Sequence, residues 1–374
     1  MIKIDELKIT PVSMVTKENL QMIVLDYICS KAEHLWLTVY KDNNPIAKTP
    51  IAFDGGKGRT DVLLPMQDNE FEALWEISDK DGNVVFETAA VWKKPIERTI
   101  YVMVSSHTDI GLHNSQYIQR YNSSRFIDEA INICDKYNDD DKYRYTIEGT
   151  WFWNNYGMDR GRDKAQYIAD NYIKKGKLGM CCGVAGNHIQ TYGLEEMCRS
   201  AYEKKRLYNQ WGIESETISM IDNNGLDMAM IQPYAEAGYK NVIFSPNQWN
   251  PIKSGVWKMD MTHPSCTWSP QAGGGGSRID VRFGSELPMV FYWEGEDERR
   301  ILVWCSTHYD FGGEMFGLES LIPFDESVMR KMEQRNCDIL ALLDKKYPYS
   351  VWLTSSYGDD EQPNTNIIDA IKAW

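Results

Sequence analysis

The feature that most constrains the fold is an alternation, from Arg98 onward, between short apolar segments and longer segments with helical periodicity. The apolar segments read as strands over residues 99–106, 143–148, 177–182, 217–222, 241–245, 289–293, 300–307 and 349–355. Helical periodicity covers residues 115–137, 151–175, part of 194–212, 227–238, 325–346 and 366–374. Because the strands are apolar without interruption, they predict a parallel α/β sheet covered by helices. About seven repeats favour a barrel, in which the chemistry lies at the carboxyl ends of the strands.

Residues 1–97 lack this alternation and consist of short β-like segments separated by turn residues. The segments that predict strands are residues 20–28, 34–40, 60–64, 70–77 and 84–92. Strands at this spacing, without helical periodicity, predict a small all-β sandwich domain over residues 1–97. The Lys93-Lys94-Pro95 segment then reads as a linker to an α/β domain over residues 98–374.

The charge balance excludes two classes of partner. The 374 residues include 40 basic and 54 acidic side chains, for a net charge of −14. Binding to nucleic acid or to an anionic membrane surface needs a surplus of Lys and Arg, so neither partner is expected. No stretch approaches the roughly eighteen apolar residues of a membrane span. The 13 Trp and 21 Tyr residues favour a carbohydrate partner, because flat aromatic rings suit sugar rings. The sequence does not indicate an oligomeric state.

The eight cysteines do not form a recognisable metal motif. They are at positions 29, 134, 181, 182, 198, 266, 305 and 337. None forms a Cys-x-x-Cys pair, and the adjacent Cys181 and Cys182 are poorly placed to bind one ion together. We therefore expect reduced, buried thiols of the kind found in the cytosol. The start of the chain, MIKIDELKITPVSMV, has no basic region followed by an apolar core, so it predicts no signal peptide and a cytoplasmic location.

The end of the first strand of the α/β region carries His107 and Asp109. Residues i and i+2 of a strand project to the same side, about 6 to 7 Å apart along it. An imidazole and a carboxylate that converge in this way can hold a divalent metal such as zinc. The alternative is a hydrogen-bonded His–Asp pair that only caps the strand.

Carboxylates also follow other strands of the α/β region. Asp222 follows the strand over residues 217–222, and the adjacent Asp359 and Asp360 follow the last strand. Each has a structural alternative, since Asp is frequent as a helix N-cap and in Asx turns. Further polar and aromatic residues at strand ends are Glu148, Trp151, Trp153, Tyr309 and Asp310.

Paired carboxylates, a His–Asp metal pair and aromatic residues together indicate sugar chemistry. A retaining glycosidase needs one carboxylate as the nucleophile and another, about 5 Å away, as the acid/base. Asp222 and Asp360 are the candidates for these two roles. A divalent ion at His107 and Asp109 would bind vicinal hydroxyls and help to distort the sugar ring.

Four segments in order resemble motifs of the family 38 glycoside hydrolases, the retaining α-mannosidases. YVMVSSHTDIGLH resembles the first metal motif, and ISMIDNNGLDMAMIQPYAEAGYKNVIF resembles the nucleophile segment. FYWEGEDERRILVWCSTHYDFG is similar to the strand pair that presents a Tyr-Asp to the substrate. VWLTSSYGDDEQPNTNIIDAIKAW resembles the Gly-Asp-Asp segment that carries the acid/base. The resemblance spans residues 98–374, and family members often carry a β domain in front.

The resemblance implies a role for each matching residue. His107, Asp109 and the nucleophile Asp222 would hold a zinc ion, and Asp360 would be the acid/base with Asp359 beside it. Tyr309 and Asp310 would be the substrate contacts. The implied fold is a (β/α)7 barrel, and the implied activity is that of a zinc-dependent retaining α-mannosidase.

The sequence departs from the family pattern at several positions. Leu112 occupies the place of an aromatic residue that floors the sugar subsite. The family usually has an Arg near the end of the next strand. In this sequence Pro246 occupies that place, with Asn247 next to it. The family's fourth zinc ligand is a His in a helical domain after the Gly-Asp-Asp segment. The sequence contains no counterpart, so we expect a barrel truncated before that domain. The unassigned histidines considered as substitutes are His113 and His188, for which surface or loop roles are the alternative.

Two other functions remain open from the sequence. A metal-dependent sugar deacetylase on a similar barrel normally needs a His-x-x-x-His pair beside an Asp. No such pair exists among His34, His107, His113, His188, His263 and His308. A catalytically silent carbohydrate-binding fragment is the second alternative, and the missing fourth ligand favours it. A purely structural α/β domain does not explain carboxylates at four separate strand ends.

Overall fold

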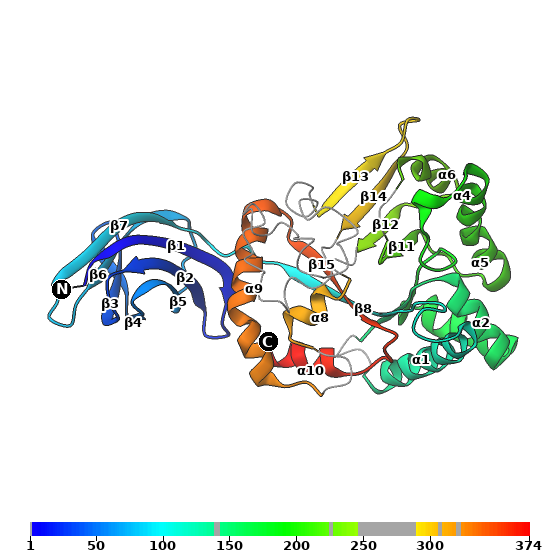
Figure 1. Cartoon of the computed structure of the whole chain (residues 1–374), viewed down its shortest axis with the longest axis horizontal. Coiled ribbons are helices and arrows are strands. Elements are labelled where there is room, and N and C mark those ends of the chain that lie inside the picture. Colours follow the sequence, from blue (N-terminus) through cyan, green and yellow to red (C-terminus); the bar gives the residue numbers. More distant parts are fainter. Residues whose placement is uncertain (1, 138–142, 224–226, 246–288, 306–308, 319–322) are drawn as a thin grey trace. The chain divides into compact units, whose positions relative to one another are not determined.

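The computed structural model describes residues 2–137, 143–223, 227–245, 289–305, 309–318 and 323–374 (Figure 1). The chain divides into two compact units. Unit 1 contains Met1–Thr99 and Glu333–Val351, and unit 2 contains Ile100–Met332 and Trp352–Trp374. The division into domains 1–97 and 98–374 stays a prediction.

Unit 1 contains two antiparallel sheets. The three-stranded sheet has the order β1-β2-β5, with bounds Ile4–Val15, Leu20–Cys29 and Gly56–Pro65. The four-stranded sheet has the order β4-β3-β6-β7, with bounds Asn44–Phe53, Glu33–Lys41, Phe71–Ser78 and Val84–Trp92. One apolar core takes side chains from both sheets, including Ile23 and Leu25 from β2 and the stacked rings of Trp75 and Trp92. Burial of these alternating side chains is what stabilises the pair of sheets.

Strands β1 and β4 lie outside the five segments named from the sequence as examples of five or more strands. Each is an edge strand of its sheet. β4 contains Pro45 and Pro50, and β1 contains Pro11. Proline cannot donate to a neighbouring strand and is tolerated at an edge, so these two strands lack the clean alternation that marked the others.

Unit 2 contains two four-stranded sheets (Figure 1). One sheet has the order β10-β9-β8-β15, with bounds Leu178–Met180, Tyr145–Ile147, Thr99–His107 and Val351–Asp359. The other has the order β11-β12-β14-β13, with bounds Thr217–Ile221, Asn241–Ser245, Arg300–Cys305 and Val290–Glu294. The β8–β9, β9–β10, β11–β12 and β12–β14 pairs are parallel, whereas β13 is antiparallel to β14.

The two sheets of unit 2 approach each other where β10 and β11 lie. Cys182, just after β10, forms a parallel bridge with Ile218 of β11. At the other side of the first sheet, Asp360 N–H donates to His107 O at 2.7 Å, so β15 and β8 end side by side. The fold is therefore mixed α/β with several sheets. No closed barrel is found among the described residues.

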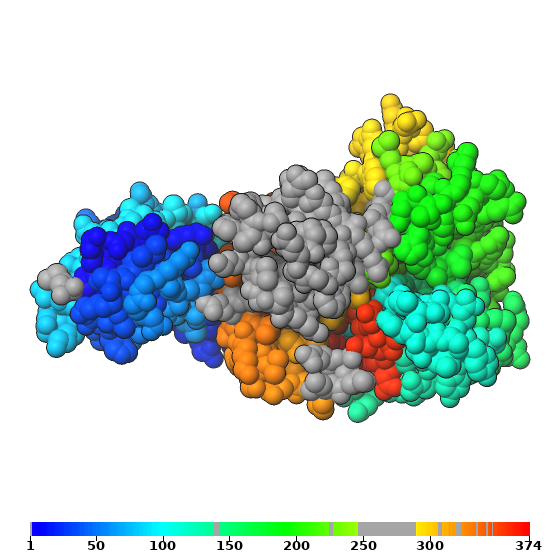
Figure 2. All heavy atoms as spheres, viewed as in Figure 1, coloured from blue at the N-terminus to red at the C-terminus, as the bar shows by residue number. Residues whose placement is uncertain are grey.

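The helices of unit 2 follow the predicted segments, with breaks. They are α1 (Gln116–Lys136), α2 (Thr150–Arg160), α3 (Arg162–Ile168), α4 (Leu194–Ala201), α5 (Glu203–Trp211), α6 (Ile231–Glu236), α8 (Phe311–Met315) and α10 (Asn366–Ala373). The single helix predicted over residues 151–175 is wrong, because Gly161 adopts a φ of 85° and separates α2 from α3. In the space-filling view, the green segment of unit 2 that contains α4, α5 and α6 lies at the surface (Figure 2).

Helix α9 (Glu326–Lys346) contributes to both units, and its residues from Glu333 onward belong to unit 1. Within unit 1, Arg59 of β5 pairs with Asp26 of β2 at 2.5 Å and with Asp338 of α9 at 2.6 Å. No helix of the described residues is both long enough and apolar enough to cross a membrane. The described cysteines, which are Cys29, Cys134, Cys181, Cys182, Cys198, Cys305 and Cys337, are all free thiols.

Candidate functional site

The site is built around His107, the last residue of β8. The strand becomes buried toward its carboxyl end, so the imidazole is only 5% exposed. Its Nδ1 lies 3.1 Å from the Oε1 atom of Glu148, which follows β9. The ring packs against Tyr309, with 5.1 Å between the ring centroids. The parallel pairing of β8 with β9 thus places two strand-end side chains in contact.

Two carboxylates approach the opposite nitrogen of the same ring. His107 Nε2 lies 3.6 Å from Asp222 Oδ2 and 3.9 Å from Asp109 Oδ1. One ligand atom from each of these three residues lies within 4.8 Å of the others. Among described residues, His107 Nε2 has no hydrogen-bond partner although it is buried. One imidazole nitrogen and two carboxylates form a donor set that zinc accepts.

The electrostatics of this cluster are dominated by its negative groups. Burial alone would lower the pKa of His107, because it disfavours the imidazolium. The carboxylates of Glu148 and Asp222 oppose this effect and raise the pKa of His107 well above its ordinary value. The cluster therefore attracts positive charge, whether a proton or a cation.

A second histidine lies on the solvent side of the cluster. His113 Nδ1 is 3.0 Å from Asp360 Oδ2 and 3.6 Å from Asp109 Oδ2. Its side chain is 50% exposed, in contrast to the buried His107. His113 follows the turn at Gly111, whose φ of 96° brings the chain back toward the strand ends. From the sequence, this residue is a candidate metal ligand, with a surface or loop role as the alternative.

Asp359, the last residue of β15, is tied to Tyr309. The phenol of Tyr309 donates to Asp359 Oδ1 at 2.8 Å. Partial loss of hydration raises the pKa of the Asp359 carboxyl. The bond from Tyr309 and the charge of His107 oppose this rise, while Asp109 and Asp222 add to it. Burial and then Asp359 raise the pKa of Tyr309, so the phenol stays protonated and acts as a donor.

The backbone is unusual at two of the strand-end carboxylates. Asp222 has a φ of 54° and Asp360 a φ of 53°, both in the left-handed region. The other non-glycine residues with positive φ in the described part of the chain are Asn19, Asp42, Asn43 and Glu298, all in turns between antiparallel strands. Left-handed residues outside such turns concentrate at functional sites, where they redirect a side chain. Asp222 N–H donates to Ser245 O at 2.8 Å, which stabilises its turn.

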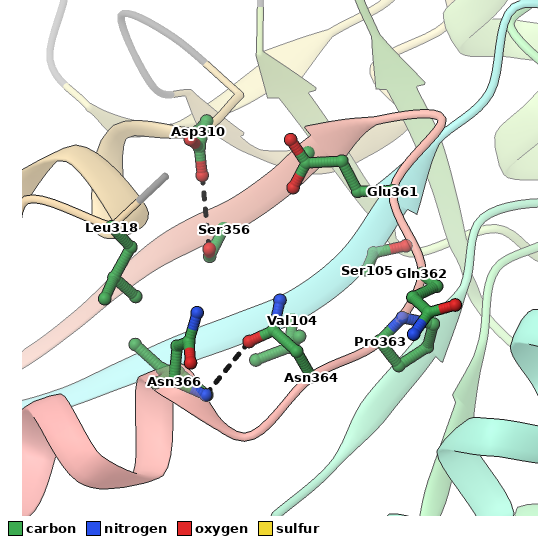
Figure 3. A pocket seen from close by; sticks show the side chains of 12 residues that line it. Val104, Ser105, Asp310, Leu318, Ser356, Glu361, Gln362, Pro363, Asn364 and Asn366 are labelled. Carbon is green, nitrogen blue, oxygen red and sulfur yellow. Dashed lines mark hydrogen bonds between the residues drawn. The ribbon is translucent and has the colours of Figure 1, made fainter. Parts of the chain in front are cut away.

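Asp310 lies in a different environment from Tyr309 before it. Its Oδ1 accepts from Ser356 Oγ at 3.1 Å, and it lines a pocket with Glu361 and Asn364 (Figure 3). None of the residues around His107 Nε2 belongs to the lining of this pocket. The structure thus brings His107, Asp109, Asp222, Asp359, Asp360 and Tyr309 into one network, with Asp310 on the side of the pocket.

Some sequence expectations concern other parts of the chain. Pro246, Asn247, His263, Cys266 and His308 lie outside the described residues. Leu112, in the place of the expected aromatic residue, is 72% exposed. His188 is exposed and precedes a short 3-10 helix at Ile189–Thr191. The pairings of Glu148 with His107 and of His113 with Asp360 were not predicted. Both require knowledge of which strand ends are neighbours.

Residues 97–374 match the family model described as Glycosyl hydrolases family 38 N-terminal domain. No curated protein sequence matches the chain.

The chain spans about a quarter to a third of the length of three solved structures that resemble it. One is an alpha-mannosidase from Enterococcus faecalis V583, with 14% identity and a TM-score of 0.49 over 74% of this chain and 26% of that chain. A glycosyl hydrolase family 38 protein from Enterococcus faecalis has 12% identity and a TM-score of 0.44 over 74% of this chain and 27% of that chain. A 4-alpha-glucanotransferase from Thermococcus litoralis has 12% identity and a TM-score of 0.40 over 71% of this chain and 34% of that chain.

Proposed function

The chain belongs to glycoside hydrolase family 38, and on that premise we propose that it is a zinc-dependent retaining α-mannosidase-type glycoside hydrolase. The observation that carries the proposal is the convergence of His107, Asp109 and Asp222 within 4.8 Å at the ends of β8 and β11. The substrate is a carbohydrate, and neither nucleic acid nor a membrane is a proposed partner. The cytoplasmic location also belongs to this proposal, supported by the free thiols of the described cysteines.

His107, Asp109 and Asp222 are the residues that would hold the zinc ion. They fit it because they offer one nitrogen and carboxylate oxygens, and because buried His107 Nε2 has no hydrogen-bond partner among described residues. When bound, the ion supplies positive charge that polarises sugar hydroxyls. Carboxylates predominate among these residues, and the ring of Tyr309 packs against His107.

Asp222 is the proposed nucleophile. Its carboxylate attacks the anomeric carbon, the bond to the leaving oxygen breaks, and a covalent glycosyl–enzyme forms. The left-handed backbone and the Asp222 N–H bond to Ser245 O support this role, because they fix where the carboxylate points. Water then attacks the same carbon from the opposite face, the bond between that carbon and Asp222 breaks, and the Asp222 carboxylate is regenerated. The product therefore keeps the α configuration.

Asp360 is the proposed acid/base, with Asp359 beside it. In the first step Asp360 gives its proton to the leaving oxygen, and in the second it takes a proton from the attacking water. Its bond to half-exposed His113 places it on the solvent side, where a leaving group departs. Asp359 is anchored by Tyr309, and Tyr309 and Asp310 are the proposed substrate contacts.

The (β/α)7 barrel is the fold we propose for the catalytic part, residues 98–374, with a β-sandwich domain over residues 1–97. The consecutive parallel order of β8, β9 and β10 and of β11, β12 and β14 supports it. The bridge between Cys182 and Ile218 supports continuity between the two sets. That the barrel closes between β14 and β15 is part of the proposal.

The test is hydrolysis of an aryl α-mannoside by the purified chain. We expect activity that a chelator removes and that added zinc restores, with NMR detection of the α-anomer as the first product. Isothermal titration with zinc and with mannose separates this enzyme from a catalytically silent carbohydrate-binding fragment. Activity that survives exhaustive chelation would contradict the zinc dependence, and release of the β-anomer would contradict the retaining mechanism.

A further inference from the structure

Glu148 is a buried carboxylate for which the proposed reaction has no role. It follows β9 and precedes Gly149, the N-cap of α2, and its side chain is only 4% exposed. A carboxylate so far from water is costly unless it is paired. In the described parts of the chain, no Lys or Arg pairs with it, and its ion-pair partner is His107. The contact with His107 thus explains how a charged Glu148 carboxylate can be buried here.

The hydrogen bond between Glu148 and His107 determines which ring nitrogen is available to a metal. Glu148 Oε1 accepts from His107 Nδ1 at 3.1 Å when that nitrogen carries the proton. In the neutral ring, the lone pair is then on Nε2, which faces Asp222 Oδ2 and Asp109 Oδ1. A carboxylate behind a metal-binding histidine selects the tautomer, fixes the ring and raises its basicity.

The backbone around Glu148 gives this carboxylate little freedom. Thr150 N–H and Trp151 N–H donate to Gly183 O and Val184 O, which fixes the start of α2 just after Glu148. A side chain at Gly149 would meet Val184 O at 2.9 Å, so the turn is closely packed. The carboxylate is therefore held by its surroundings as well as by the imidazole.

We propose that Glu148 is a positioning residue that holds His107 with the proton on Nδ1 and Nε2 free, and thereby strengthens divalent-cation binding at His107, Asp109 and Asp222. This proposal rests on the proposed function, because it needs the metal site to exist. Glu148 touches neither substrate nor cation, and it acts through His107.

The test compares Glu148→Gln with Glu203→Gln in the full chain. Glu203 is the control, because it is a similarly buried carboxylate that is not among the residues that contact His107. It accepts from Thr150 Oγ1 at 2.7 Å and pairs with Arg206. Zinc affinity is measured by competition with a chromogenic chelator. We expect Glu148→Gln to weaken zinc about 10- to 100-fold, and Glu203→Gln to leave the affinity within about twofold of wild type.

A second readout needs no metal and separates positioning from folding. Long-range 15N–1H spectra of histidine-labelled, metal-free protein report which ring nitrogen carries the proton, and His107→Gln identifies the His107 signals. The spectra are recorded at a pH above the raised pKa of His107, where the ring is neutral. We expect the proton on Nδ1 in wild type and in Glu203→Gln, and a mixture of tautomers in Glu148→Gln. Equal zinc affinity and an unchanged tautomer in Glu148→Gln would overturn the role of Glu148 while the metal site stands. A wild-type chain without zinc affinity would overturn the metal site and the role of Glu148 with it.

Discussion

The two histidines of the site divide it into halves that differ in exposure. The inner half consists of His107, Glu148 and Asp222, all buried, with each contact made by a residue at a strand end. The outer half consists of His113, Asp359 and Asp360, of which His113 is half-exposed and Asp359 exposed. Asp109 touches both halves, through His107 Nε2 and His113 Nδ1.

This difference in exposure suggests that the two halves have different functions. A buried set of fixed donors loses little freedom when it binds a cation, because its side chains are already held. A proton donor, in contrast, must exchange its proton with water or with a leaving group. The side chain of Asp360 is only 13% exposed, and its contact with half-exposed His113 connects it to solvent. We therefore expect inner-half variants to affect metal and activity together, and outer-half variants to affect activity in a way that depends on the leaving group.

The largest effect is expected for Asp222→Asn in the inner half. We expect kcat/KM on an aryl α-mannoside to fall at least about 1,000-fold, which is about 4 kcal/mol. Asn tolerates the left-handed backbone that Asp222 adopts, so the fold should persist. Steady-state kinetics and near-UV circular dichroism measure the two quantities.

Asp42→Asn is the matched control for this variant. Asp42 also has a positive φ, of 49°, but lies in the turn between β3 and β4 of unit 1. Full activity in this control and loss in Asp222→Asn would locate the effect in the site. Full activity in Asp222→Asn would exclude Asp222 as the nucleophile.

The next largest effect is expected for Asp360→Ala in the outer half. Hydrolysis of natural mannosides should slow about 100- to 1,000-fold, whereas a dinitrophenyl mannoside, whose leaving group needs no proton, should slow less than about tenfold. Asp359→Ala serves as the comparison, because its carboxylate is adjacent and is anchored by Tyr309. Equal loss on both substrates for Asp360→Ala would mean that another residue is the acid.

Low pH should weaken zinc binding at the inner half, by a smaller factor than the losses expected for Asp222→Asn and Asp360→Ala. A proton must leave His107 Nε2 before a cation binds there, and Glu148 and Asp222 raise the pKa of His107. Zinc affinity should therefore fall as the pH drops below that raised pKa, by up to about tenfold per pH unit. Titration calorimetry between pH 5 and pH 8 measures it. A flat affinity over this range would exclude His107 as a ligand.

The smallest effect is expected outside both halves, at Asp128 of α1. Burial would raise its pKa, but hydrogen bonds from Lys164, Arg160 and Tyr156 lower it. The folded pKa then lies below the unfolded one, so the stabilisation exists above about pH 4 and disappears as the pH falls through the folded value. Asp128→Asn should lower the free energy of unfolding by about 1 kcal/mol at pH 7, since the group is partly exposed. Urea unfolding at pH 7 and pH 3 tests this, and zinc affinity should not change.

Much of unit 2 could be predicted from the sequence because its strands are apolar and short. The strand predicted over residues 241–245 has the observed bounds, and that over residues 217–222 ends one residue early. The predicted helix over residues 115–137 begins at Gln116, where Ser115 accepts from Ile118 N–H as a cap. Local signals of this kind need no knowledge of the neighbours.

The rest of the fold and site depends on which elements become neighbours. β15 continues to Asp359, beyond the predicted end at Ser355, because it pairs beside β8 along its length. The contact of Glu148 with His107 follows from the pairing of β9 with β8, and the contact of His113 with Asp360 from that of β15 with β8. A single sequence records the residues at each strand end but not their pairing. The roles of the site residues remain predictions.

The adjacency of β8 and β15 also has a consequence for how the protein is made. His113 and Asp360 are 247 residues apart in the sequence, and the outer half exists only when both are present. On the ribosome, the inner half is complete once Asp222 has emerged, whereas the acidic pair arrives more than a hundred residues later. Contacts between such distant segments form late and slowly, because a long loop must close first. A nascent chain would then acquire its proposed metal ligands well before it acquires its proposed proton donor, and during that interval the edge of β8 would be open to incorrect pairing.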